Sequence, residues 1–127
     1  MLLLLALHSI SCSFDSTQQL PVAKIDLYQE TIILSMPQQP VPLEQALPLR
    51  LILPAGVTPK LAIVEGESME MGRIPIQWRS AEGNEWQATL YLGACTESEM
   101  EWRMTIPLAH SDNNLPTSVT FTFSSKR

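Results

Sequence analysis

Four sulfur-bearing side chains in the middle of the chain are the residues best suited to chemistry. Met69 and Met71 are separated by one residue in "SMEM", and Cys95 and Met100 bound the later segment "CTESEM". Thiolate and thioether sulfurs are soft donors, which select Cu(I) over hard cations. Met69 and Met71 share one side of an extended segment, and a tight turn would bring Met100 back toward Cys95. We therefore take Met69, Met71 and Cys95 as candidate Cu(I) ligands and Met100 as a weaker fourth.

Each sulfur also has an interpretation without a metal. For Met100 it is packing on the same strand face as Met104, if that strand begins early. Cys95 ends the strand-like run "TLYLGAC", so a small buried side chain is as good an account of it as a ligand, and a disulfide with Cys12 is a third. Met69 and Met71 stand in a polar segment that favours exposure, and for them function and packing weigh equally. The metal hypothesis requires the sulfurs of Met69 and Cys95 to lie together at one rim of the fold.

The other methionines and the histidine indicate no further site. Met104 falls in an alternating run and Met36 stands alone before a proline, so we expect both to pack in the core. Once an N-terminal leader is removed only His110 remains, in a polar loop where a solvated side chain is expected. A blue-copper site needs two histidines and a cysteine, and structural zinc needs four spaced ligands. We predict no enzymatic activity, because no nucleophile motif surrounds Cys95 or His110.

Composition predicts one small acidic domain. The chain has 127 residues, 45% of them hydrophobic, and a net charge of −5 with a pI near 4.9. This length fits one domain with a modest core. The negative charge argues against nucleic acid, whose phosphates require a basic face, and no small-molecule substrate is evident.

The N-terminus indicates export. Residues 1–12 begin with an apolar run that is too short to span a membrane and end in "HSISC", which resembles a bacterial lipobox with Cys12 as the lipidated residue. A plain secretory signal is the alternative. Residues 13–24 form a polar stretch suited to a tether between a lipid anchor and a folded domain. We therefore expect a protein on the periplasmic side of a bacterial membrane, with the lipid anchor as its contact with that membrane.

Residues 25–127 predict an all-β domain. Ten prolines leave little room for helix beyond one turn at "LEQAL", and apolar runs of strand length alternate with polar residues. Strands at this spacing favour an antiparallel immunoglobulin-like β-sandwich of about seven strands, with "SAEGNEW" as a hairpin loop. The predicted strands are Ile25–Ser35, Ala46–Leu53, Leu61–Glu65, Ile74–Arg79, Trp86–Leu92, Glu101–Pro107 and Ser118–Phe123.

Three elements of the central third resemble the YtkA-like and FixH-like proteins, a family of small exported immunoglobulin-like domains. The elements are Met69–Gly72, the run "GNEWQATL" at Gly83–Leu90, and "MEWRMTI" at Met100–Ile106. The resemblance implies a role in copper delivery to respiratory oxidases or in their assembly. Two hypotheses follow: an accessory protein that handles Cu(I), or an envelope module that docks a protein partner and binds no metal. Genome neighbourhood and a metal analysis of the purified protein are the observations that would best separate them.

Overall fold

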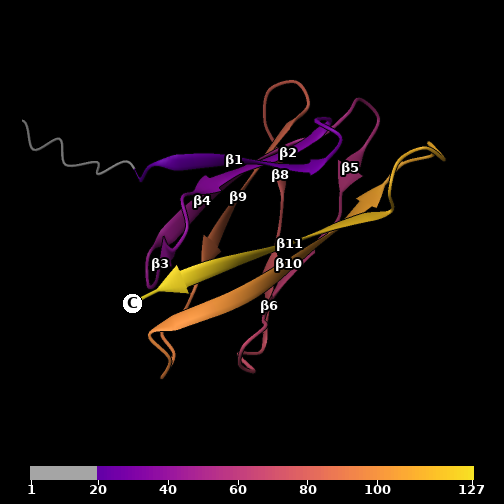
Figure 1. Ribbon diagram of the computed structural model, residues 1–127. Helices are drawn as coiled ribbons and strands as arrows, with labels where there is room; N and C mark the ends of the chain where they lie inside the picture. The colour runs from indigo at the N-terminus through magenta and orange to yellow at the C-terminus, as the bar shows by residue number, and fades with distance from the viewer. Residues whose placement is uncertain (1–19) are drawn as a thin grey trace, which may run out of the picture.

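The computed structural model describes residues 20–127 and folds them entirely from strands and loops (Figure 1). This part of the chain contains no helix, and so none long and apolar enough to cross a membrane. The predicted leader with Cys12 and residues 13–19 of the predicted tether lie outside the described residues. The tether prediction ran to Lys24, but the first strand already begins at Val22, so its last three residues belong to a sheet.

Eleven strands are present in residues 20–127, where about seven were predicted. Five predicted strands are found with shifted ends, two divide into two strands each, and two additional strands have only two residues each. The segment "LEQAL" contains a bend and the start of a strand rather than a helical turn. The strands are β1 (Val22–Tyr28), β2 (Ile32–Pro37), β3 (Val41–Pro42), β4 (Ala46–Ile52), β5 (Thr58–Pro59), β6 (Ala62–Gly66), β7 (Arg73–Ile76), β8 (Arg79–Ser80), β9 (Glu85–Tyr91), β10 (Glu99–Ala109) and β11 (Ser118–Lys126).

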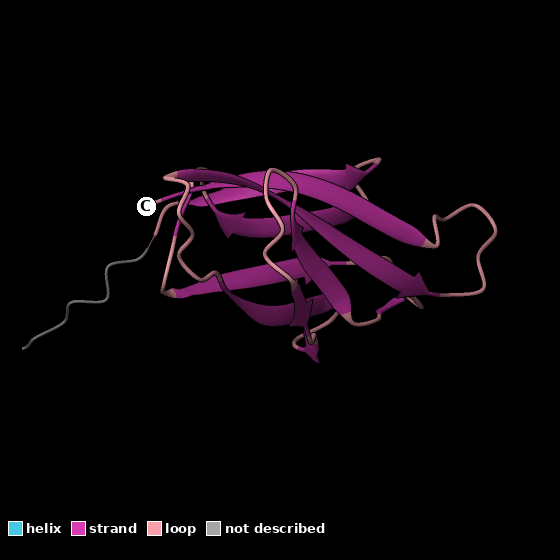
Figure 2. Ribbon diagram, turned by 90° about the horizontal axis from the view of Figure 1, so that it is seen from below, coloured by secondary structure: helices cyan, strands magenta, loops and turns pink. Residues whose placement is uncertain are grey.

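The strands form two sheets that lie in two layers (Figure 2). The first sheet has the order β1-β2-β4-β9-β8, and the second has β3-β11-β10-β6-β7, with β5 added to the far end of β10. All pairings are antiparallel except that of β3 with β11, which is parallel, so the second sheet is mixed rather than purely antiparallel as predicted. The run Ile74–Arg79, predicted as one strand, divides between the sheets: β7 pairs with β6, and β8 pairs with β9.

A single apolar core fills the space between the sheets because the strands alternate in polarity. The predicted alternation of "WQATLYL" is confirmed: Ala88, Leu90 and Leu92 are buried, while the residues between them are exposed. Met36 and Met104 are fully buried, as predicted. The Trp102 side chain makes a polar contact within this core: its Nε1 donates a hydrogen bond of 2.8 Å to the Ser125 hydroxyl.

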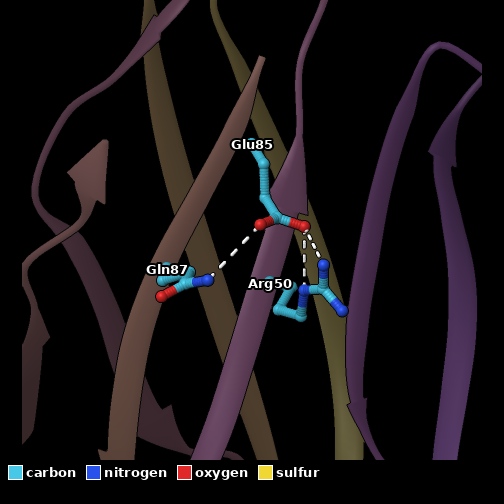
Figure 3. A network of polar contacts seen from close by, with 3 residues as sticks. All are labelled: Arg50, Glu85 and Gln87. Carbon is cyan, nitrogen blue, oxygen red and sulfur yellow. Dashed lines mark hydrogen bonds and ion pairs between the residues drawn. The ribbon is translucent and has the colours of Figure 1, made fainter. Parts of the chain in front are cut away.

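The outer face of the first sheet carries a small polar network (Figure 3). Arg50 on β4 contacts Oε1 of Glu85 on β9 through both Nε, at 2.8 Å, and Nη2. Gln87 donates from Nε2 to the other carboxylate oxygen of Glu85 at 3.3 Å. Because the Arg50 side chain is 61% exposed, this ion pair adds little to stability.

The predicted strand Ile25–Ser35 is wrong because the chain reverses at Gln29 and Glu30. Both residues have positive φ angles, 43° and 60°, and the Thr31 amide donates to the Tyr28 carbonyl at 2.9 Å. The Asp26 carboxylate accepts hydrogen bonds from the Tyr28 and Glu30 amides at 3.0 and 2.9 Å, which stabilises the turn. Tight hairpin turns of this kind usually contain Asn or Gly, and neither is present.

We predict that Glu30→Gly stabilises the protein. The left-handed backbone costs a residue with a Cβ about 1–2 kcal/mol, whereas glycine loses only about 0.5–1 kcal/mol of extra entropy. The free energy of unfolding, measured in urea, should rise by roughly 0.5–1 kcal/mol. Ala55→Gly is the matched control, because Ala55 lies in an exposed turn without a positive φ angle and its replacement should destabilise. A lower midpoint for Glu30→Gly than for the unaltered protein would contradict this account of the turn.

Candidate functional site

Two loops carry the candidate ligands and meet at one end of the sheets. The Met loop (residues 67–72) connects β6 to β7, and the Cys loop (residues 92–98) connects β9 to β10. Strand β6 is antiparallel to β10, with Gly66 opposite Trp102, so the end of β6 lies beside the beginning of β10. Both loops therefore leave the fold at the same end, the lower one in Figure 1.

The sulfurs of Met69 and Cys95 are in direct contact. The Cys95 thiol donates to the Met69 thioether with an Sγ–Sδ distance of 2.9 Å. Cys95 is a free thiol, and both side chains are half-buried against the edge of the core. The convergence that the metal hypothesis required, between residues 26 positions apart in the sequence, is therefore present.

The other two candidate ligands differ in their surroundings. Met71 is half-buried, and its Cγ lies 3.3 Å from the position that a Cβ on Gly66 would occupy. Met100 is only 2% exposed, and its sulfur accepts a hydrogen bond of 3.5 Å from the Ser68 hydroxyl. The polar neighbours of the "SMEM" pair favoured exposure, but Met69 and Met71 both turn their side chains against the core.

The backbone of the Met loop is held in place by β10. The Glu67 amide donates to the Glu101 carbonyl at 2.7 Å, and the Glu101 amide donates to the Ser68 hydroxyl at 3.2 Å. Gly66 makes this fold possible, since a Cβ there would lie 2.1 Å from the Met69 carbonyl oxygen. The loop ends at Gly72, which has a φ angle of +72°.

Charged side chains surround the two loops at the surface. Glu67 pairs with Arg103 on β10, and Glu65 pairs with Arg73 at 3.0 Å. The Cys loop is tied to the last strand, because the Arg127 guanidinium donates to the Cys95 carbonyl at 3.4 Å. Because the side chains of these ion pairs are in contact with solvent, the pairs contribute little free energy. The hydrogen bonds to β10 are therefore the main restraint on the Met loop.

The donor set at this end is made of sulfur. Residues 20–127 contain no group of three or more His, Cys, Asp or Glu side chains arranged to hold a metal ion. His110 was expected to be solvated, but it is half-buried and bound within its own loop, through Nε2 to the Pro116 carbonyl at 2.7 Å and through Nδ1 to the Asp112 amide at 3.2 Å. A thiol and a thioether in contact are suited to a soft monovalent cation.

Sequence reasoning missed the two residues that shape the site, Gly66 and Ser68. A glycine at the end of a strand pattern is a recognised sign of close backbone approach, so Gly66 offered a usable signal. Ser68 offered none, because its two partners lie 32 and 33 residues further along the chain.

The chain matches no protein-family model, and neither a curated protein nor a solved structure matches it. Its function therefore has to be inferred from the geometry of the two loops.

We predict that Gly66→Ala disrupts the sulfur site. The added Cβ would meet backbone rather than a flexible side chain, so the Met loop must shift, at a cost of roughly 1–3 kcal/mol. Urea unfolding should show the loss of stability, and alkylation of Cys95 by iodoacetamide should become faster as Met69 moves away. Gly93→Ala is the matched control, because nothing lies within 4 Å of its Cβ position. Equal alkylation rates in the two variants would refute the proposed role of Gly66.

Proposed function

We propose that this protein is an exported, lipid-anchored accessory protein without enzymatic activity that handles Cu(I) for the assembly of respiratory oxidases. The observation that carries the proposal is the contact of 2.9 Å between the Cys95 thiol and the Met69 thioether. Two soft donors from separate loops, joined at the surface end of a rigid scaffold, form the minimum set that Cu(I) requires.

Metal binding would change this contact in a defined way. The Cys95 thiol would lose its proton, and the cation would enter between the two sulfurs. If the metal–sulfur bonds resemble those of other thiolate sites, at ~2.3 Å each, a linear site needs the sulfurs roughly 4.6 Å apart. They are now 2.9 Å apart, so one of the two side chains must move. The three rotatable bonds of Met69 supply that freedom, and Met71 on the same loop is the natural third ligand.

The order of strands supports the immunoglobulin-like part of the proposal. Such domains place strands A-B-E-D in one sheet and G-F-C in the other. Taking β2, β4, β9 and β8 as the first set and β11, β10 and β6 as the second gives this order, with β1 as an added edge strand. Between β2 and β3 the chain passes from one sheet to the other. Fold alone does not give function, so this analogy adds to the sulfur geometry without replacing it.

The cellular setting of the proposal comes from the N-terminal sequence and from the resemblance to the YtkA-like and FixH-like proteins. A lipidated Cys12 would leave Cys95 as a lone thiol in an oxidising compartment. In such a compartment a lone thiol is oxidised or forms a disulfide unless it binds a metal or is shielded. The contact with Met69 would shield Cys95. The proposed partner is an envelope protein that accepts the metal.

We predict that the purified, reduced protein retains one Cu(I) in competition with a chromogenic Cu(I) chelator. Cys95→Ser should weaken binding by at least about a hundredfold, because the loss of a charged ligand exceeds that of a neutral hydrogen bond, and Met69→Leu by about tenfold. Met36→Leu, which alters a methionine buried elsewhere in the core, is the control and should leave affinity unchanged. Absence of retained metal at stoichiometric chelator would end the copper proposal and leave the metal-free docking module.

We also expect Cu(I) affinity to fall as the pH is lowered. Binding replaces the thiol proton of Cys95, so protons and Cu(I) compete for the same sulfur atom. The check is the same chelator competition repeated between pH 6 and pH 8 with a correction for chelator protonation. In Cys95→Ser the slope should disappear; a slope that persists there would assign the released proton to another group.

A further inference from the structure

We propose that Ser68 is the positioning residue of the sulfur site, and that Met100 serves as a hydrogen-bond acceptor for Ser68 rather than as a metal ligand. The Ser68 hydroxyl makes two contacts: it accepts from the Glu101 amide at 3.2 Å and donates to the Met100 sulfur at 3.5 Å. Ser68 immediately precedes Met69, so these contacts fix the point from which the Met69 side chain departs.

The Glu101 amide shows why a side chain is needed at this point. Strand β6 pairs with β10 up to Gly66 opposite Trp102, and the Glu67 amide adds one more backbone bond to the Glu101 carbonyl. Had β6 continued, the Glu101 amide would have met a backbone carbonyl. The Ser68 hydroxyl takes the place of that carbonyl, which lets the chain turn away from the sheet without leaving an amide unpaired.

The position of Met100 fits an acceptor and not a ligand. It belongs to the buried face of β10 together with Trp102 and Met104, and it is 2% exposed. Its sulfur is already engaged by Ser68 from the direction of the Met loop. To reach a cation beside Cys95, the Met100 side chain would have to leave the core and release that hydroxyl, which costs both buried apolar area and a hydrogen bond.

The placement of Met69 over Cys95 thus depends on one hydroxyl group. With Ser68 in place the Met loop is ordered and the Met69 sulfur lies beside Cys95 before any metal arrives, so binding requires a movement of side chains and not the ordering of the loop. Without the Ser68 hydroxyl, the Glu101 amide would hydrogen-bond to water. The Met loop would then be held by the hydrogen bond of the Glu67 amide and by packing over Gly66. The inference concerns the site of the proposed function and rests on that function only for its metal readout.

The first test uses the metal-free, reduced protein. Ser68→Ala should raise the rate of Cys95 alkylation by iodoacetamide several-fold, up to about tenfold for a lost hydrogen bond of typical strength. It should shift the methyl NMR signal of Met69 while leaving those of Met36 and Met104 in place, which separates a local change from unfolding. Ser68→Thr keeps the hydroxyl and should restore both values, and Ser80→Ala, at a serine bonded only to the adjacent Ala81 carbonyl, is the control. An unchanged alkylation rate and Met69 signal in Ser68→Ala would overturn the inference, whether or not the protein binds copper.

The second test separates the roles of the two methionines with Cu(I) present. Met100→Leu should change the affinity by no more than about twofold, because leucine fills similar core volume and the Glu101 amide still holds Ser68. Ser68→Ala should weaken binding by about tenfold, although its hydroxyl touches no ligand. A loss in Met100→Leu as large as that in Met69→Leu would make Met100 a ligand and refute the assignment. If the unaltered protein retains no Cu(I), the proposed function fails, and the alkylation and NMR result alone decides the role of Ser68.

Discussion

The arrangement of the whole molecule depends on strand β10. It is the longest strand in the described residues, it pairs with β11 along its length, and it also pairs with β6 and β5. Every second residue from Met100 to Leu108 is buried, so one face of β10 supplies a continuous stripe of core while its edges align its neighbours. A shift of one residue in its register would turn that entire stripe to solvent, and this fixes where each neighbouring loop begins.

The sulfur contact follows from this alignment. An antiparallel partner of β10 must end where β10 begins, so the Met loop after β6 is brought beside the Cys loop that leads into β10. The local details then add precision: Gly66 removes the atom that would keep the loop away, and Glu101 provides both a donor and an acceptor for it. The pairing of the strands thus brings together two loops that are far apart in the sequence.

The features that follow from the alternation of apolar and polar residues could be predicted from the sequence. The features that depend on which strands pair with one another could not. The buried faces of β9, β10 and β11 follow from a period of two, and they were predicted because burial on one side imposes that period. The reversal at Gln29 was missed because an Asp26 carboxylate, rather than a glycine, stabilises the turn. The two-residue strands, the passage of the chain from β7 to β8, and Ser68 were missed because each depends on a partner more than five residues away, which no local pattern reports.

The contact between the Cys95 thiol and the Met69 thioether also affects how each sulfur can react. The Cys95 and Met69 side chains are both half-buried, and each covers part of the other's sulfur. If the protein binds Cu(I) as proposed, the cation has to separate the two sulfurs, because two metal–sulfur bonds of ~2.3 Å span more than their present contact. Part of the metal–sulfur energy would then be used to open the pair, and it would be recovered when the metal leaves and the contact closes. Under the proposed function, such a site would hold Cu(I) less tightly than a preformed cage of the same ligands, which would suit transfer to an acceptor better than storage.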